Sequence, residues 1–178
     1  MSIRYAILGL LSRQPLTGYA LKKLFAEAET LYWTGNNNQI YRTLVELHKA
    51  HLVTQVVHPQ EDAPARKVYT ITAAGQAALH AWLQTPPELP QVRNPFMLQL
   101  TWADQLDDAD LDSLLARYEE ELRIKGLMLR EQNQRGFSLP PQTERGQLLA
   151  ARITARWLDY YGRELALVRD LRRELMGK

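Results

Sequence analysis

The stretch that decides the fold runs from Gly35 to Gly75 and reads GNNNQIYRTLVELHKAHLVTQVVHPQEDAPARKVYTITAAG. Its first part opens with a run of amides and then repeats apolar residues at helical spacing, namely Ile40, Leu44 and Leu47. This pattern predicts an amphipathic helix over about residues 37–51. Its second part holds two runs of strand composition, 53–57 and 67–71, around a polar loop that contains proline. A helix followed by such a hairpin is typical of a winged helix-turn-helix.

The segments on either side of this stretch also have helical patterns. Apolar residues in 2–13 recur at a spacing of three to four, which predicts a first helix with one buried side. Thr17 has the residue type of an N-cap for a second helix, whose expected apolar side is Tyr19, Ala20, Leu21, Leu24 and Phe25. Thr72 is placed to cap a fourth helix, in which Gly75 costs up to about 1 kcal/mol relative to alanine. We therefore expect another segment to pack closely against Gly75.

A proline-rich segment divides the chain. Residues 85–90 read TPPELP, which is typical of a stiff, extended linker. The sequence thus predicts two domains, a winged helix-turn-helix over 1–85 and a helical domain over 86–178. The expected fold class is mostly α with a small β-hairpin, and the second domain is expected to be an antiparallel helical dimerisation domain.

The second domain has the pattern of three helices. Asn94 and Pro95 have the residue types of an N-cap and first-turn position, opening a short helix to about residue 103. Asp107 and Asp108 are placed to cap a long helix to about residue 134. The last helix, about 142–176, is long for a small globular domain, so we expect it to pair with a partner chain.

Composition excludes several classes of protein. The chain has 178 residues, a net charge of +2 and no cysteine, so disulfides, thiolate metal sites and cysteine nucleophiles are excluded. It has neither a signal-peptide pattern nor an apolar run of membrane-spanning length, and we expect a cytoplasmic protein without a membrane partner. We find no phosphate loop, nucleophile elbow or acid–base pair, so we expect no enzyme activity, cofactor or metal.

The charges are distributed unevenly between the two domains. Residues 1–85 hold eight Lys/Arg against five Asp/Glu, whereas 86–178 hold fourteen against fifteen. A basic first domain favours a nucleic-acid partner. Amide, phenol and guanidinium groups at the start of the third helix can reach base edges in a major groove, and basic residues of the hairpin can meet phosphates. The candidate DNA-binding residues are Asn36, Asn37, Asn38, Gln39, Tyr41, Arg42, Thr43, Lys49, Arg66, Lys67, Arg4, Tyr19 and Lys22.

Other interpretations remain open for several of these residues. The asparagine run also suits a cap and a polar turn, with Asn37 or Asn38 as the N-cap, and Arg66 and Lys67 also suit a solvated hairpin. For the whole domain, the alternative is a winged-helix module that binds a protein partner through the third helix without DNA. Retention on a DNA column that falls with salt distinguishes the two.

The chain resembles the PadR family of bacterial transcription regulators. The matching segments are 6–11 (AILGLL), 16–23 (LTGYALKK), 39–41 (QIY), 52–53 (LV), 68–75 (VYTITAAG) and 94–98 (NPFML). The resemblance implies a winged-helix homodimer that binds double-stranded operator DNA, represses transcription and dimerises through its C-terminal helices. Two positions differ from the family pattern: His51 stands where glycine is usual, and Arg42 stands where proline is common.

A small aromatic effector is the remaining partner considered. Some members of the family that the chain resembles respond to phenolic acids and others to drugs, so the resemblance implies a small effector of this kind. Aromatic residues, mostly expected in packing, could also line a cavity between the two domains, where Arg93 and Arg156 are the available cations. The candidate effector-binding residues are Trp82, Arg93, Phe96, Trp102, Tyr118 and Trp157.

Overall fold

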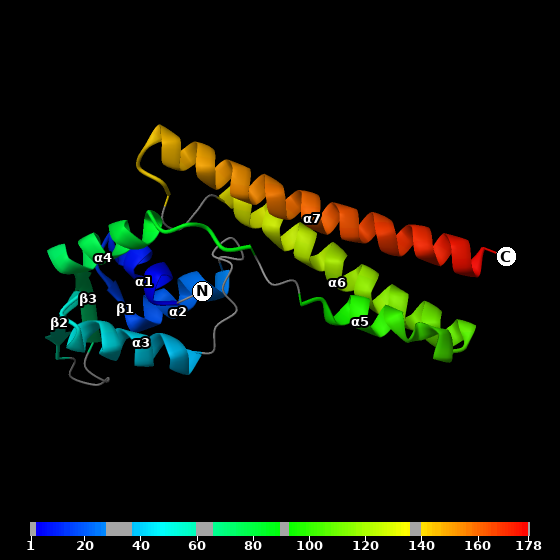
Figure 1. The fold of residues 1–178 in the computed structure, drawn as a ribbon, viewed down its shortest axis with the longest axis horizontal. Helices are drawn as coiled ribbons and strands as arrows, with labels where there is room; N and C mark the ends of the chain where they lie inside the picture. Colours follow the sequence, from blue (N-terminus) through cyan, green and yellow to red (C-terminus); the bar gives the residue numbers. More distant parts are fainter. Residues whose placement is uncertain (1–2, 28–36, 60–65, 90–92, 136–139, 178) are drawn as a thin grey trace. The chain divides into compact units, whose positions relative to one another are not determined.

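The chain folds into two compact units. The computed structural model describes residues 3–27, 37–59, 66–89, 93–135 and 140–177. The units are Met1–Pro87 and Glu88–Lys178, so they divide inside the proline-rich segment, two residues beyond the expected boundary. Figure 1 shows α1 to α4 and a small sheet in the first unit, and α5 to α7 in the second. The fold is mostly α with a small sheet, as the sequence predicted.

Four helices form most of the first unit: α1 (Ile3–Leu11), α2 (Gly18–Glu27), α3 (Asn37–Lys49) and α4 (Ala73–Leu83). Thr17 caps α2, because its Oγ1 accepts a hydrogen bond from the Ala20 N–H at 3.0 Å. Thr72 caps α4 in the same way, accepting from the Gly75 N–H at 3.0 Å. Both predicted caps are confirmed.

Three short strands make an antiparallel sheet in the order β1-β3-β2. The hairpin strands are β2 (Val53–His58) and β3 (Arg66–Ile71), each one residue longer than expected. The third strand, β1 (Leu16–Thr17), was not predicted, since two residues are too few to show a period. Through β1 the start of α2 is tied to the hairpin, because Leu16 pairs with Tyr69 and Thr17 pairs with Val68.

The core of the first unit fixes the inner side of α3. Its largest fully buried side chains are Ile7, Leu8, Leu11, Leu21, Ile40, Leu44, Leu47 and Val53. Burial of a side chain of this size contributes about 1.5–3 kcal/mol. The three buried apolar residues of α3, Ile40, Leu44 and Leu47, are those predicted from the spacing. The opposite side of α3 is therefore presented on a rigid support.

The turn after α3 has a left-handed residue at His51, whose φ is 57°. The N–H of His51 donates to the carbonyl of His48 and the N–H of Leu52 donates to the carbonyl of Leu47, both at 3.0 Å. This pair of bonds is the Schellman arrangement, which most often has glycine at the left-handed position. Histidine therefore occupies a conformation that glycine adopts with less strain.

Gly75 lies against the backbone of that turn. A Cβ placed on Gly75 would stand 2.1 Å from the carbonyl oxygen of Leu52 and 2.7 Å from the side chain of Ile71. The close packing expected at Gly75 is confirmed. It anchors the start of α4 against the link between α3 and β2.

The second unit consists of α5 (Pro95–Thr101), a 3-10 turn η2 (Ala103–Gln105), α6 (Asp108–Arg135) and α7 (Glu144–Met176). Asn94 caps α5, its Oδ1 accepting from the Met97 N–H at 3.2 Å. Asp107 accepts from the Asp110 N–H at the start of α6 at 2.8 Å. The cap of α7 is Thr143, which the sequence had placed inside the last helix rather than before it.

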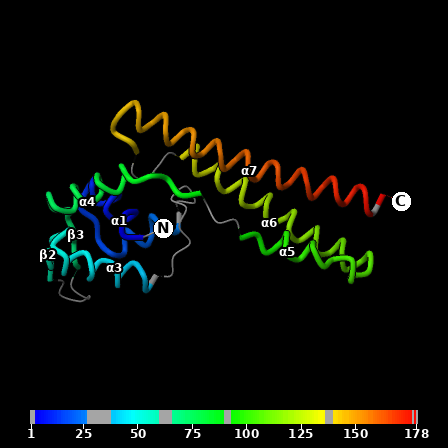
Figure 2. The backbone as a smooth tube through the Cα atoms, viewed as in Figure 1, coloured from blue at the N-terminus to red at the C-terminus, as the bar shows by residue number. Residues whose placement is uncertain are grey.

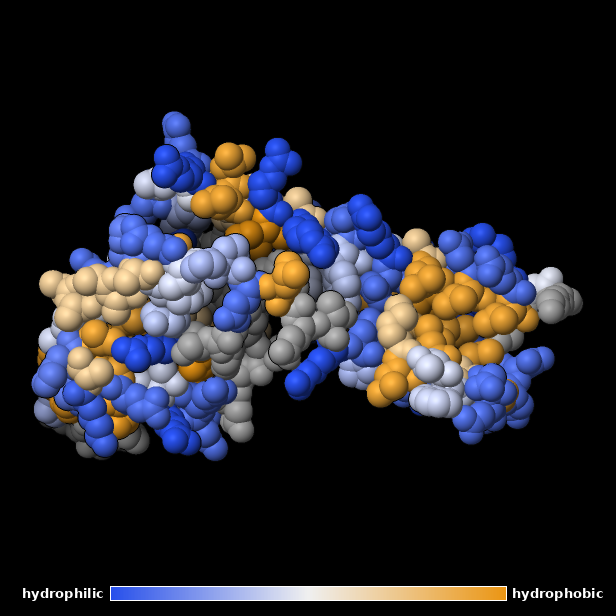
Figure 3. All heavy atoms as spheres, in the orientation of Figure 1, coloured by the Kyte–Doolittle hydropathy of each residue, from blue (hydrophilic) through white to orange (hydrophobic). Residues whose placement is uncertain are grey.

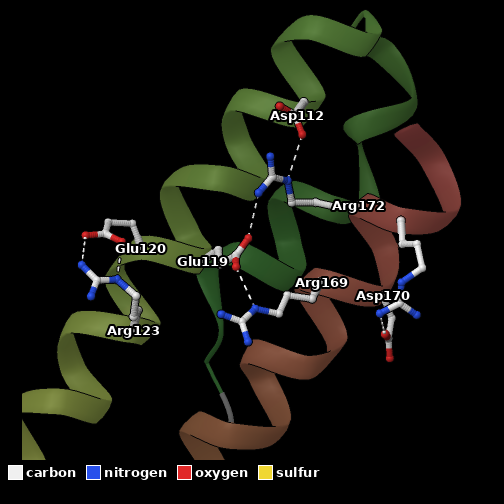
Figure 4. A network of polar contacts seen from close by, with 8 residues as sticks. Asp112, Glu119, Glu120, Arg123, Arg169, Asp170 and Arg172 are labelled. Carbon is white, nitrogen blue, oxygen red and sulfur yellow. Dashed lines mark hydrogen bonds and ion pairs between the residues drawn. The ribbon is translucent and has the colours of Figure 1, made fainter. Parts of the chain in front are cut away.

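Helices α6 and α7 run antiparallel, side by side over most of their length (Figure 2). Their core contains Phe96, Leu115, Leu122 and Val168. An ionic network closes one side of the pair (Figure 4). Arg172 donates to Asp112 at 2.9 Å and to Glu119 at 2.8 Å, and Arg169 donates to Glu119 at 2.8 Å. These two guanidinium groups hold the pKa of the Glu119 carboxyl below its usual range.

Apolar side chains remain exposed on the second unit. Figure 3 shows apolar residues gathered where α5 and the C-terminal part of α7 lie. The exposed large apolar residues of α5, α6 and α7 are Leu98, Ile124, Leu127, Met128, Leu148, Leu149, Ile153, Leu167 and Leu175. Within the described parts of the chain, no helix has both the length and the apolar composition needed to cross a bilayer.

Candidate nucleic-acid interface

The outer side of α3 carries several of the candidate DNA-binding residues. Asn38, Gln39, Arg42 and Lys49 are all exposed, while Ile40, Leu44 and Leu47 of the same helix are buried. Because residues three and four apart share a side of a helix, the exposed residues form one polar stripe. This stripe has hydrogen-bond donors and acceptors of the kind that read base edges.

Arg42 is the most prominent cation of this stripe. Its side chain is 83% exposed, and its Nε lies 3.1 Å from Oε1 of Glu46, whose side chain is 62% exposed. An exposed pair at this spacing contributes little to stability. The contact uses Nε, and an arginine guanidinium is the group that most often pairs with guanine.

Three of the expected residues are placed differently or are not described. Thr43 is 6% exposed, which leaves its side chain little surface for a contact with DNA. Asn36 lies outside the described residues, and the side chain of Asn37 is not described either. Helix α3 begins at Asn37, so Asn38 lies inside the helix and not at its N-cap, and the position before the helix is outside the described residues.

One residue on this side of α3 was missed by the sequence analysis. Val45 is 50% exposed, three residues after Arg42. An apolar side chain on a helix that enters a major groove can contact the methyl group of thymine. The sequence could have indicated this, because Val45 lies three residues after Arg42 and does not belong to the buried series Ile40, Leu44 and Leu47.

The hairpin of β2 and β3, called the wing from here on, has two exposed cations at the start of β3. Arg66 and Lys67 pair with His58 and Val57 of β2, and the side chains of both are exposed. The loop 60–65 between the strands lies outside the described residues. Both cations therefore lie at the end of the hairpin, and exposed Lys and Arg side chains are able to contact phosphates.

The weaker candidates lie on the first two helices. Arg4 is exposed on α1, and Tyr19 is 71% exposed in the first turn of α2. Lys22 is partly buried on α2. Tyr19 thus stands beside the positive end of the α2 dipole, a common place for a phosphate contact.

Comparisons with known proteins agree with this architecture. The transcriptional regulator PadR-like family matches residues 7–81, and the virulence activator alpha C-terminal family matches residues 92–166. The negative transcriptional regulator PadR of Bacillus subtilis is 35% identical over 98 residues. That match covers 54% of this chain and 54% of the relative, so the chain matches about half the length of this curated regulator. These matches confirm the resemblance to the PadR family, with the PadR-like model matching residues 7–81 of the first unit.

Solved structures extend the similarity of this PadR-like chain over both units. The crystal structure of Bacillus subtilis PadR in complex with operator DNA has a TM-score of 0.82 at 23% identity, covering 97% of this chain and 98% of that one. The crystal structure of the same regulator in complex with p-coumaric acid has a TM-score of 0.74 at 22% identity. It covers 97% of this chain and 94% of that one. The Vibrio cholerae virulence activator AphA gives 0.73 at 27%, covering 99% of both chains.

The second unit of the PadR-like chain holds an aromatic cluster. Phe96 and Tyr118 stack with ring centroids 3.7 Å apart, and the Tyr118 hydroxyl donates to Glu164 at 3.0 Å. Burial and the Glu164 carboxylate raise the pKa of Tyr118 above its usual range. Trp157 stacks on Tyr161 at 5.8 Å. Phe96, Tyr118 and Trp157 therefore belong to the packed aromatic part of this unit.

The other effector candidates are not part of this cluster. Trp82 belongs to the first unit, where it stacks on Tyr5 with centroids 4.7 Å apart. Trp102 is 63% exposed at the end of α5, and Arg93 is exposed. Sequence reasoning missed Glu164, whose contact with Tyr118 spans 46 residues and leaves no local signal.

Proposed function

We propose that this PadR-like regulator binds a specific operator through α3 and the wing. The observation that carries the proposal is the polar, exposed stripe of α3 on a fully buried apolar base. Asn38, Gln39 and Arg42 are assigned to base edges, and Arg66 and Lys67 to phosphates. Arg4, Tyr19, Lys22 and Lys49 are assigned to the flanking backbone, and Val45 to a thymine methyl. The fold shared with a regulator crystallised on operator DNA supports this assignment.

We propose further that the regulator acts as a homodimer through its second unit. The exposed apolar residues of α6 and α7 supply a surface that a second copy would bury. A two-fold dimer holds two recognition helices about one DNA turn apart, so both can enter successive major grooves. The expected operator is therefore a pseudo-palindrome. The proposed place of action is the cytoplasm.

The proposed regulatory action is repression relieved by a small aromatic effector. The relative named as a negative regulator supports repression, and its structure with p-coumaric acid supports an aromatic ligand. In this chain, the cluster around Tyr118 supplies aromatic walls with one polar group, and Arg156 lies 6.0 Å from the Tyr160 ring as a nearby cation. An effector that binds one dimer geometry better would lower operator affinity by shifting the population.

The test is selection of DNA fragments by the purified full-length chain from a random duplex library. We expect enrichment of one pseudo-palindromic sequence, bound more weakly as salt rises because phosphate contacts release counterions. Addition of p-coumaric acid is expected to weaken the selected complex. Recovery of no enriched sequence, with salt-independent retention, would favour the alternative of a protein-interaction module.

A further inference from the structure

The ring of Tyr41 lies directly on the first residue of α2. A Cβ built on Gly18 would stand 2.5 Å from Cε1 of Tyr41, 3.1 Å from Cδ1 and 3.4 Å from Cζ. Carbon atoms in ordinary contact are about 3.5–4.0 Å apart. The edge of the ring thus occupies space that only a glycine leaves at this position. Gly18 itself is buried, so the contact belongs to the packed part of the unit.

Gly18 stands where three elements of the first unit meet. It follows β1 directly, and the preceding residue Thr17 both caps α2 and pairs with Val68 of β3. The neighbouring strand residue Tyr69 is 5% exposed, and burial together with the nearby Tyr41 phenol raises its pKa. The Tyr41 ring therefore links α3 to the start of α2, and α2 is joined to β3 through the pairing of Thr17 with Val68.

Tyr41 has one ring edge in this contact but is still 46% exposed. Two roles are open to such a residue: its hydroxyl can bind DNA, or its ring can fix the direction of α3. The three atoms nearest to a Cβ on Gly18 are all ring carbons of Tyr41, and the hydroxyl oxygen is not among them. The position of the ring between α2 and α3 favours the second role.

We propose that Gly18 and Tyr41 form a packing contact that positions the recognition helix for operator binding, through the ring of Tyr41 and not through its hydroxyl. The proposal rests on the proposed function, because it assigns a role in the same DNA interface. Both residues are positioning residues. A displaced ring would tilt α3 away from the base edges while leaving the phosphate contacts of the wing available.

The substitution Gly18→Ala is a selective perturbation. The atom that meets the new Cβ belongs to the outer part of a side chain, so the ring can move and the unit can still fold. Gly9→Ala is the matched control, because a Cβ on Gly9 of α1 meets nothing within 4 Å. Tyr41→Phe keeps the ring and removes the hydroxyl, while Tyr41→Ala removes both.

The experiment measures dissociation constants of the full-length variants on the selected operator and on a scrambled duplex, with urea unfolding alongside. We expect Gly18→Ala and Tyr41→Ala to lose about tenfold or more on the operator, the value of one base contact, and less than about twofold on scrambled DNA. Tyr41→Phe and Gly9→Ala should stay within about twofold on both. Gly18→Ala should add no further loss to Tyr41→Ala, because the two act through one contact.

Three results would overturn the proposal: wild-type affinity of Gly18→Ala for the operator, a tenfold loss in Tyr41→Phe, or additive losses in the double variant. If Gly18→Ala does not fold, the comparison of Tyr41→Phe with Tyr41→Ala decides between ring and hydroxyl. Failure of the wild-type chain to prefer any operator would instead reject the proposed function, which separates the two failures.

Discussion

Replacing His51 with glycine tests how α3 ends. A residue with a Cβ pays about 1–2 kcal/mol in the left-handed conformation that His51 adopts, and glycine does not. Glycine loses about 0.4–1 kcal/mol in return, because its unfolded chain has more freedom. Since histidine tolerates this conformation better than most residues, we expect His51→Gly to raise the free energy of unfolding by about 0.5–1 kcal/mol.

The contacts of His51 allow this gain to be isolated. Its carbonyl oxygen, not its imidazole, accepts the hydrogen bond from Thr72 Oγ1 at 2.8 Å, so glycine keeps that bond. The assay is urea unfolding followed by far-UV circular dichroism at fixed protein concentration. His51→Ala keeps the backbone cost and should change stability little. Ala50→Gly, one residue earlier, should lower it by about 0.5–1 kcal/mol.

The reasoning would be refuted by a less stable His51→Gly variant. It would also fail if His51→Ala gained as much as His51→Gly, because the benefit would then come from losing the imidazole.

Three further predictions concern packing, ionic contacts and assembly. Gly75→Ala should lower the free energy of unfolding by about 1–3 kcal/mol or more, since its Cβ meets the Leu52 carbonyl oxygen; urea unfolding measures this. Arg172→Ala should lower stability by about 1 kcal/mol near neutral pH. Because folding lowers the pKa of Glu119, its carboxylate contributes to the free energy of unfolding above about pH 5, and this contribution is lost as the pH falls. The Arg172→Ala variant lacks part of this contribution, so its stability should fall less on acidification than that of the wild type. Leu149→Glu should shift the dimer toward monomer in sedimentation velocity, because it places a charge in the proposed apolar interface.

Each of these has a control within the chain. Gly9→Ala should leave the free energy of unfolding unchanged or raise it. If Gly9→Ala lowered it as much as Gly75→Ala does, the close packing at Gly75 would not explain the loss. Arg163→Ala, which breaks only an exposed pair with Asp159, should leave the acid dependence unchanged. Leu89→Glu, at a side chain 93% exposed, should not alter assembly. A Leu149→Glu variant that sediments as the wild type would place the interface elsewhere.

Much of the fold could be predicted because its signals are local. Three caps, Thr17, Thr72 and Asn94, were recognised from side-chain type and position, and each accepts the expected backbone hydrogen bond. The spacing of Ile40, Leu44 and Leu47 gave the buried side of α3 correctly. The tight packing at Gly75 was also predicted, since an unfavourable glycine inside a helix needs a structural reason.

What the sequence analysis missed depends on contacts between distant segments. The strand β1 exists because Leu16 and Thr17 pair with β3, some fifty residues away, and two residues show no period. Thr43 looked like a polar surface residue, but it lies at the border of the apolar stripe and is buried. The contacts of Arg169 and Arg172 with Glu119 join two helices through residues at least 50 positions apart. Side-chain type alone does not reveal such pairs.

The most direct test of the central claim compares wild type and Arg42→Ala on the selected operator and on scrambled duplex at several salt concentrations. If α3 reads sequence, the wild type should prefer the operator by about 10³-fold or more. Arg42→Ala should then lose about 5- to 150-fold on the operator, equivalent to about 1–3 kcal/mol, with little change on scrambled DNA. Equal affinity of the wild type for both duplexes would contradict the account.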